Sequence, residues 1–345
     1  MSHRSPPLLI ASVLLFFSNL SLSYDHGNSC FVPYQESITM ANLAVNLAGV
    51  QLRNPVLTAS GTFGYGKEYK DLVPFEKIGG ITVKGVSPFP SHGNPMPRTA
   101  EVYGGMLNAI GLQNPGIDKF IAHEDYLPFL RTVDCAVFVN IWGKSIEQYA
   151  EVAARLEAEK RGIAALEINI SCPNVKEGGI AFGTDPVQAA AVVRAVRNAT
   201  TLPLVTKLSP NVTRIGDFAK AVVDAGSDMI SLINTIPGMA IDIERRAFKI
   251  ANKTGGFSGP ALKPIAVRMV YEARQAVSVP IIGIGGITTA EDVVEFMMAG
   301  ANAVAVGTAI FSDPACLVHI VDGLDVWLNR HNIADINDIV GVMQA

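Results

Sequence analysis

Short runs of β-branched and other apolar residues recur along the chain from Asn54 onward, and they alternate with segments in which apolar positions return every three to four residues. The first pattern predicts buried strands and the second predicts amphipathic helices. Eight apolar runs predict the strands 55–60, 79–84, 136–143, 165–171, 202–209, 229–234, 279–286 and 303–308. Strands that alternate with helices form a parallel sheet, and eight of them can close into a barrel. We therefore expect an α/β fold of the (βα)₈ TIM-barrel type.

The expected helices carry start and stop signals. The helix that begins after Ser145 has a capping-box pattern, and Gly162 marks its end. Asp185 is an N-cap residue in front of a proline at the first helical position. No linker rich in Gly, Pro or Ser divides the chain after Met40, so we expect residues 40–345 to form a single domain.

Three of the expected βα loops are long, namely 85–115, 172–184 and 235–260. The active site of a barrel lies at the carboxyl ends of its strands, in these loops. Loops of this length are uncommon unless they bind a ligand or cover one. We expect them to lie over an active site.

Polar residues and glycines stand at the ends of the predicted strands. Asparagine offers a carbonyl and an amide together, which suits a planar heterocycle, and lysine supplies a positive charge. Glycines after the last two strands allow backbone N–H groups to approach a phosphate. The pattern predicts a phosphorylated cofactor whose other end faces the polar side chains. These strand-end residues are Ser60, Lys84, Asn140, Asn169, Ser171, Cys172, Lys207, Asn234, Thr235, Gly285, Gly286, Gly307 and Thr308.

Composition narrows the classes of partner. The 345 residues are 49% hydrophobic and 17% charged, with a net charge of −4, which is typical of a globular protein with a large core. This charge provides no electrostatic basis for binding nucleic acid or an anionic membrane. We expect small molecules and proteins as partners, with no nucleic acid and no membrane.

The four cysteines, Cys30, Cys135, Cys172 and Cys316, are far apart and form no C-x-x-C pair. The spacing argues against a metal site, an iron–sulfur cluster and a disulfide framework in this chain. For Cys172 the residues alone leave open a small buried filler and a reacting group. Any iron–sulfur cluster would belong to another chain.

Motifs along the whole predicted barrel resemble one family. They include "NPVLTASGTFGYG", "GNPMPR", "GMLNAIGLQNPG", "NISCPNV", "VTKLSPNVT", "GGFSGPALKP", "IIGIGGI" and "AVAVGTA", in this order. From Met40 to its end the chain resembles class 1 dihydroorotate dehydrogenases, and among them the class 1B catalytic subunits, which work with an electron-transfer subunit and NAD.

The resemblance implies a bound FMN and oxidation of (S)-dihydroorotate to orotate, a step in pyrimidine (UMP) synthesis. It implies that FMN contacts Ser60, Lys84, Gly85, Asn140, Asn169, Lys207, Ile233, Gly259, Gly285, Gly286, Gly307 and Thr308. It implies that the substrate contacts Lys84, Asn108, Ala109, Ile110, Gly111, Leu112, Asn169, Asn174, Asn234 and Thr235.

Cys172 matches the catalytic base of the family, where class 2 enzymes carry serine. The implied reaction moves the C5 proton to Cys172 and the C6 hydride to FMN, and Lys207 stabilises the reduced ring. The family also implies a partner subunit with FAD and a [2Fe-2S] cluster that passes electrons to NAD. The expected assembly is a homodimer core within a heterotetramer.

Three alternatives stay open at this point. A class 1A relative would pass electrons to fumarate as a homodimer. A dihydropyrimidine-dehydrogenase-like barrel also has a cysteine in this loop, but we would expect histidine in place of Asn174. The chain could also be an exported ligand-binding protein without catalytic activity.

The first 39 residues differ from the rest, because "LLIASVLLFF" follows Arg4 and precedes small residues, as in a signal peptide. The run is too short for a membrane span of about 20 apolar residues. Either the protein is exported, or Met40 is the true start and residues 1–39 are a non-domain leader. We expect the second and a cytoplasmic protein, because the implied chemistry uses cytosolic reductants and a soluble nucleotide.

Overall fold

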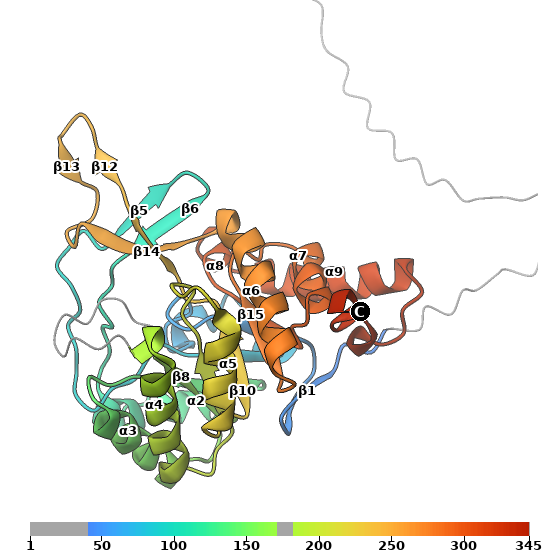
Figure 1. Cartoon of the computed structure of the whole chain (residues 1–345), viewed down its shortest axis with the longest axis horizontal. Helices are drawn as coiled ribbons and strands as arrows, with labels where there is room; N and C mark the ends of the chain where they lie inside the picture. Colours follow the sequence, from blue (N-terminus) through green and yellow to red (C-terminus); the bar gives the residue numbers. More distant parts are fainter. Residues whose placement is uncertain (1–40, 171–181, 345) are drawn as a thin grey trace, which may run out of the picture. The chain divides into compact units, whose positions relative to one another are not determined.

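Eight parallel strands close into a barrel in the computed structural model, which describes residues 41–170 and 182–344 (Figure 1). Around the barrel the order is β10-β15-β16-β3-β4-β7-β8-β9. Each strand lies within one of the eight predicted runs, so the TIM-barrel prediction is confirmed. The strands are β3 (Val56–Thr58), β4 (Gly80–Thr82), β7 (Ala136–Ile141), β8 (Ala165–Asn169), β9 (Leu204–Lys207), β10 (Met229–Leu232), β15 (Ile281–Ile284) and β16 (Ala303–Val306).

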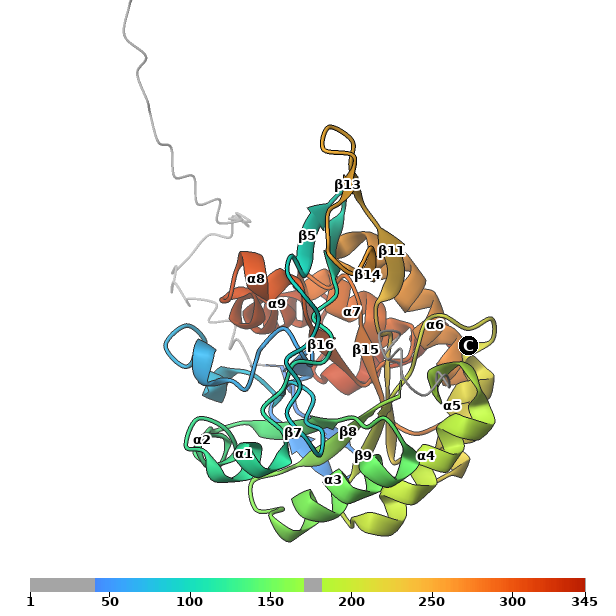
Figure 2. The ribbon, with the colours of Figure 1, turned by 90° about the vertical axis from the view of Figure 1, so that its left-hand side faces the viewer.

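Helices follow the strands and cover the outside of the barrel (Figure 2). Each long helix buries an apolar face, as Val192 and Val196 of α4 do, while its other face meets solvent. The α-helices are α1 (Ile117–Ala122), α2 (Leu127–Leu130), α3 (Ile146–Ala158), α4 (Pro186–Ala199), α5 (Ile215–Asp224), α6 (Lys263–Ala276), α7 (Ala290–Met298), α8 (Ala309–Ser312) and α9 (Cys316–Arg330). The 3₁₀ helices are η1 (Lys67–Tyr69), η2 (Phe75–Lys77), η3 (Phe182–Thr184), η4 (Pro260–Leu262), η5 (Ile336–Ile339) and η6 (Val342–Gln344).

The predicted helix starts are found, and one predicted end is wrong. The Ser145 side chain accepts from the backbone N–H of Gln148, and the Asp185 side chain accepts from that of Val187. Helix α3 ends four residues before Gly162, which instead adopts a φ of +84° in the turn that leads to β8. Glycine is favoured there because L-residues rarely adopt this conformation.

Two of the long loops contain a sheet that the sequence patterns did not predict. Strands β5 (Thr99–Val102), β6 (Gly105–Asn108), β11 (Ile236–Met239) and β14 (Thr254–Ser258) form it in the order β11-β14-β6-β5. The short strands β12 (Ile241–Asp242) and β13 (Ala247–Phe248) form a hairpin that projects beyond this sheet (Figures 1 and 2). A separate hairpin near the start of the described chain pairs β1 (Val45–Leu47) with β2 (Val50–Leu52).

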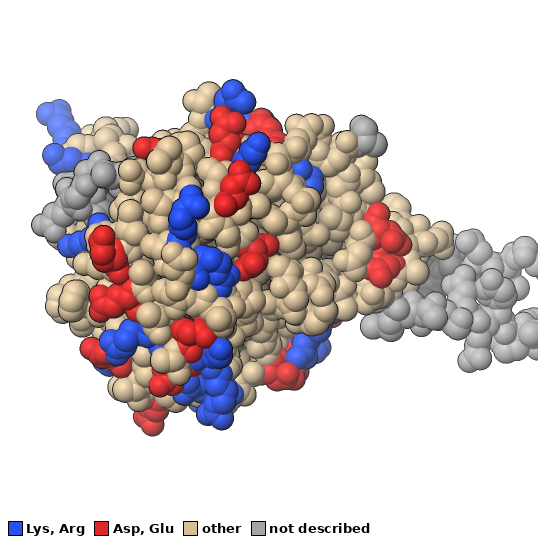
Figure 3. All heavy atoms as spheres, turned by 60° about the horizontal axis from the view of Figure 1, so that its bottom comes forward, with Lys and Arg blue, Asp and Glu red and all other residues tan. Residues whose placement is uncertain are grey.

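The face shown in Figure 3 carries lysine and arginine side chains interspersed with aspartate and glutamate. Such mixing prevents a strong field of one sign on that face. Among the described residues, no helix combines the length and apolar character needed to cross a membrane. Within the same residues, no cluster of three or more His, Cys, Asp or Glu side chains could hold a metal ion.

Candidate active site

A buried polar network contains three of the predicted strand-end residues, Ser60, Asn140 and Lys207. Glu167, which was not among the predicted residues, lies between Asn140 and Lys207 in this network. The Asn140 amide Nδ2 donates to Glu167 Oε1 at 2.8 Å, and Lys207 Nζ lies 3.8 Å from the same oxygen. Lys207 Nζ also donates to Ser60 Oγ at 3.2 Å. Asn140, Glu167 and Lys207 are at most 5% exposed, so each polar group depends on the others for its partners.

Strand register explains why these side chains meet. Side chains two residues apart on a strand share a face, so Glu167 and Asn169 of β8 both point into the barrel. The register pairs Asn140 with Glu167 and Asn169 with Lys207. The barrel therefore stacks these polar side chains in adjacent layers at its carboxyl end.

Asn169 and Asn234, two predicted substrate contacts, also come together. The Asn234 amide Nδ2 donates to Asn169 Oδ1 at 3.5 Å, and the Thr235 backbone N–H donates to Asn234 Oδ1 at 2.7 Å. The Tyr149 hydroxyl donates to the Asn169 carbonyl at 2.7 Å. These bonds hold the two amides side by side at the ends of β8 and β10.

Thr235 lies against Gly256, which pairs with a third predicted contact, Asn108. A Cβ placed on Gly256 would collide with the Thr235 side chain. Gly256 is the register partner of Asn108 and accepts from its Nδ2 at 3.4 Å. The unpredicted sheet thus carries Asn108 to the region of the strand ends.

The loop that follows Asn108 is held by backbone hydrogen bonds. Ala109 N–H donates to the Arg98 carbonyl at 2.7 Å, and the Ile110 carbonyl accepts from the Asn94 N–H at 3.0 Å. Gly111 and Leu112 both adopt positive φ, at +77° and +56°. This conformation is unusual for leucine and makes the loop turn sharply.

Gly85 lies beside Asn140, and Lys84 precedes it in the chain after β4. A Cβ placed on Gly85 would lie 2.7 Å from Asn140 Oδ1 and 3.0 Å from Trp142 Cδ1, so only glycine allows this approach. A Cβ placed on Gly61 would lie 4.0 Å from Lys84 Nζ, which puts the ammonium group next to the backbone that follows β3. The ends of β3, β4 and β7 therefore meet in one polar region.

The predicted phosphate loops also converge. A Cβ on Gly286 would lie 2.8 Å from Lys263 N, which places the loop after β15 against the start of α6. Ile233 N–H donates to the Ile284 carbonyl at 2.9 Å, beside Gly285. At the end of β16, Thr308 Oγ1 donates to Ser258 Oγ at 2.8 Å.

Gly259 and Gly307 complete this group. Gly259 has a φ of +123° and follows Ser258, and a Cβ there would lie 2.5 Å from Gly105 Cα. Gly307 is different, because a Cβ there would meet Ala59 Cβ at an ordinary 3.5 Å. Neighbouring protein atoms therefore do not require glycine at this position.

Cys172 and Asn174 lie outside the described residues, as does Ser171. Two other thiols are described. Burial raises the pKa of Cys135 to about 12 and that of Cys316 to about 11. Both are protonated at neutral pH and are poor nucleophiles or bases.

The site has features that a phosphorylated planar cofactor such as FMN would satisfy. Among the described residues, two buried side-chain atoms lack a hydrogen-bond partner, Trp142 Nε1 and Ser231 Oγ. An unpaired buried donor costs about 1–3 kcal/mol, and an acceptor on a bound ligand would remove that cost. Trp142 borders Gly85 and Asn140, so its unpaired N–H is at the candidate site. The residues present fit FMN.

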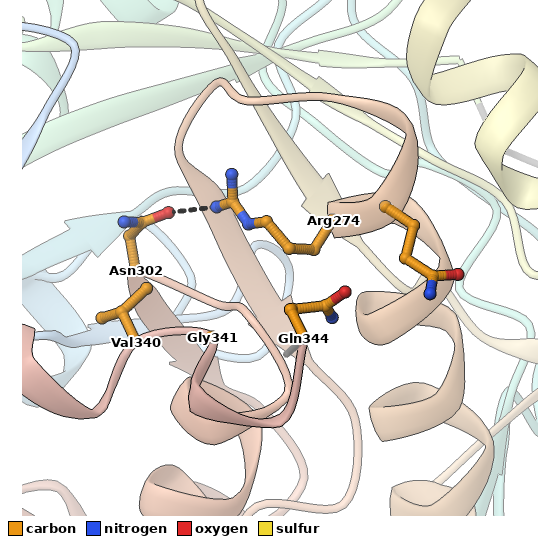
Figure 4. A pocket seen from close by; sticks show the side chains of 6 residues that line it. Arg274, Asn302, Val340, Gly341 and Gln344 are labelled. Atoms are coloured by element: carbon orange, nitrogen blue, oxygen red, sulfur yellow. Dashed lines mark hydrogen bonds between the residues drawn. The ribbon is translucent and has the colours of Figure 1, made fainter.

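A separate surface hollow uses its polar groups for structure (Figure 4). The Arg274 guanidinium donates to Asn302 Oδ1 at 2.6 Å and to the backbone carbonyls of residues 277, 279 and 300. The Gln344 amide donates to the carbonyls of Tyr271 and Ala299. The Gln344 bonds attach the end of the described chain to the barrel, and the Arg274 bonds join α6 to the segments before β15 and β16, at the opposite end from the polar network. The lining residues are Arg274, Gln275, Asn302, Val340, Gly341 and Gln344.

Comparison with known proteins agrees with this geometry. A family model described as dihydroorotate dehydrogenase matches residues 42–328. Two relatives are both called dihydroorotate dehydrogenase B (NAD(+)), catalytic subunit. The one from Geotalea uraniireducens is 57% identical over 302 residues, which cover 88% of this chain and 98% of the relative. The one from Lachnoclostridium phytofermentans is 55% identical over 303 residues, which cover 88% and 100%.

A solved structure has the same fold. It is the dihydroorotate dehydrogenase of Eimeria tenella in complex with ferulenol, with a TM-score of 0.72 and 24% identity, and it covers 91% of this chain and 92% of its own. At this identity the likeness shows the fold alone. The family model and the relatives show more: this chain belongs to the dihydroorotate dehydrogenase family.

Proposed function

We propose that this chain is the catalytic subunit of a class 1B dihydroorotate dehydrogenase, which oxidises (S)-dihydroorotate to orotate in pyrimidine synthesis. The observation that carries the proposal is the identity of 53–57% with relatives named as NAD(+)-linked catalytic subunits, over nearly their whole length. These names favour class 1B over a fumarate-linked class 1A enzyme, a dihydropyrimidine-dehydrogenase-like barrel or an exported binding protein. The proposed catalytic domain is residues 40–345.

FMN is the proposed cofactor, and the predicted residues divide between its two ends. Gly259, Gly285, Gly286, Gly307 and Thr308 would hold the phosphate, since backbone N–H groups in glycine loops bind anions. Ser60, Lys84, Gly85, Asn140, Asn169, Lys207 and Ile233 would contact the rest of the cofactor. When bound, FMN supplies a two-electron acceptor for the hydride from C6 of the substrate.

The substrate carries ring N–H and C=O groups and a carboxylate. Asn108, Asn169, Asn234 and Thr235 offer the matching donors and acceptors, and the contacts among them support a common binding region. Lys84 would supply positive charge for the carboxylate. Ala109, Ile110, Gly111, Leu112 and Asn174 complete the proposed substrate contacts.

Cys172 is the proposed base, and it would take the proton from C5 of dihydroorotate. An unperturbed thiol has a pKa of about 8.5, so the thiolate fraction and the rate should rise with pH around neutrality. Lys207 would stabilise negative charge that develops next to it during the reaction.

The proposed partner is an electron-transfer subunit with FAD and a [2Fe-2S] cluster, and the proposed assembly is a heterotetramer around a homodimer. The relatives' name, catalytic subunit, supports a second subunit for NAD(+). Exposed apolar side chains on the projecting hairpin, Ile241, Ile243 and Phe248, support contacts with another chain.

A dye-coupled assay tests the substrate assignment. The purified chain with FMN should form orotate from dihydroorotate when an artificial electron acceptor is present. Dihydrouracil lacks the carboxylate and should be a poor substrate. A preference for dihydrouracil would favour the dihydropyrimidine-dehydrogenase-like alternative, whereas efficient turnover with fumarate would favour class 1A.

A further inference from the structure

Glu167 is a buried carboxylate at the base of the candidate site, and neither the motifs nor the proposed contacts give it a role. It is 4% exposed and lies between Asn140, which is 1% exposed, and Lys207, which is 5% exposed. A buried charge is costly even when it is paired, and apolar side chains could fill the same space at less cost. Its partners therefore suggest what it does.

The contact with Asn140 determines which way that amide points. A carboxylate only accepts hydrogen bonds, so the amide nitrogen of Asn140 must face Glu167. The amide oxygen consequently faces Gly85, where a Cβ would lie 2.7 Å from it. Glu167 thus makes Asn140 present its acceptor oxygen, and not its donor nitrogen, at the ends of β4 and β7.

The contact with Lys207 is of a different kind. The separation of 3.8 Å is an ion pair but exceeds the usual hydrogen-bond distance of about 2.7–3.2 Å. The ammonium group has three donors, and one of them is directed at Ser60 Oγ. Glu167 therefore compensates the charge of Lys207 while leaving donors for another partner.

We propose that Glu167 is a positioning residue for the flavin site: it orients the Asn140 amide and compensates the positive charge of Lys207. The proposal rests on the proposed FMN binding. With the carboxylate removed, Lys207 contributes an uncompensated positive charge. This charge favours the reduced, more negative flavin over the oxidised one.

Two variants separate the two effects. Glu167→Gln keeps the shape and an acceptor for Asn140 but loses the charge. We expect it to raise the ratio of FMN affinities, reduced over oxidised, about tenfold, which is about 30 mV in the midpoint potential of a two-electron couple. Glu167→Asp keeps the charge but shortens the side chain by one methylene. We expect it to weaken binding of both forms and to leave their ratio unchanged.

The measurements are FMN binding by fluorescence, a dithionite titration with a reference dye, and thermal unfolding of the flavin-free chain. Glu157→Gln on α3 is the control, because it removes one negative charge outside the barrel. If Glu167→Gln folds and its ratio of reduced to oxidised FMN affinity equals that of wild type, then Glu167 does not compensate the charge of Lys207. If Glu167→Gln does not fold, Glu167→Asp still tests the positioning role. Wild-type FMN affinity in Glu167→Asp would overturn that role.

These tests are independent of the substrate. Dithionite replaces dihydroorotate, so an incorrect substrate assignment leaves the outcome unaffected. A wild-type chain that binds no FMN would overturn this proposal together with the proposed cofactor.

Discussion

Lys207 reaches across the mouth of the barrel, and its Nζ lies 3.2 Å from Ser60 Oγ although the two residues are 147 positions apart. Lys207 ends β9, and Ser60 follows β3, which is the fourth strand from β9 in either direction around the barrel. The two side chains therefore close the top of the barrel interior, and a cofactor at the strand ends would lie on this polar surface.

Replacing Lys207 by methionine should slow flavin reduction more than it weakens FMN binding. The ammonium group stabilises charge that is greater in the transition state, and removal of one such group typically costs about a hundredfold or more in rate. Stopped-flow reduction by dihydroorotate measures this effect. Lys253→Met, at an exposed position in the turn before β14, is the matched control and should reduce at the wild-type rate. Equal flavin reduction rates in Lys207→Met and Lys253→Met would show that Lys207 does not take part in the reaction.

Cys172→Ala should bind FMN normally but lose most of its reduction rate near neutral pH, because the proposed base is gone. The control is Cys316→Ala, whose thiol has a pKa raised to about 11 by burial and stays protonated. A pH profile of the reduction rate from pH 6 to 10 gives the comparison. A Cys172→Ala chain with the wild-type profile would show that another group takes the proton.

Two glycine variants should have different effects. In Gly286→Ala the new Cβ would lie 2.8 Å from Lys263 N at a φ of +78°, so we expect lower thermal stability even without FMN. In Gly307→Ala the Cβ has ordinary contacts, so stability should be kept while FMN affinity falls. Differential scanning calorimetry and FMN titration separate the effects. Normal FMN affinity in Gly307→Ala would argue against a cofactor phosphate at this strand end.

Glu157 should contribute to stability in a defined pH range. Hydrogen bonds from Lys160, Thr200 and Thr201 lower its pKa from 4.5 to about 2. Because the folded-state pKa is lowered, the contribution is full above about pH 4.5 and is lost as the pH falls through about 2. Urea midpoints of wild type and Glu157→Gln should therefore differ at pH 7 and converge toward pH 2. A difference that does not change with pH would mean that the charge of Glu157 is not its cause.

The fold was predictable because each barrel strand is a short, locally apolar run between helical segments. The sheet formed by β5, β6, β11 and β14 was not, because its strands contain few apolar residues in alternation. Its two halves, β5 with β6 and β11 with β14, are joined by the pairing of β6 with β14, whose partners Asn108 and Gly256 are 148 positions apart. "YGG" before β6 is a possible turn signal, but a glycine turn alone does not identify its distant partner strand.

Glu167 shows the same limit within the site. Its charge inside the run "ALEINIS" was a visible signal, since strand interiors are otherwise apolar. Its partners come from β7 and β9, and only closure of the barrel brings Asn140 and Lys207 to it. Residues at strand ends could be predicted one by one, whereas the pairings among them depend on the register between strands.

In the proposed reaction this chain transfers electrons from dihydroorotate to bound FMN. Anaerobic mixing of the purified, FMN-loaded chain with one equivalent of dihydroorotate tests this transfer, with flavin absorbance and orotate measured together. We predict bleaching of the flavin and formation of one orotate for each FMN reduced. A flavin that stays oxidised with dihydroorotate, but is reduced by dithionite, would contradict the proposed reaction.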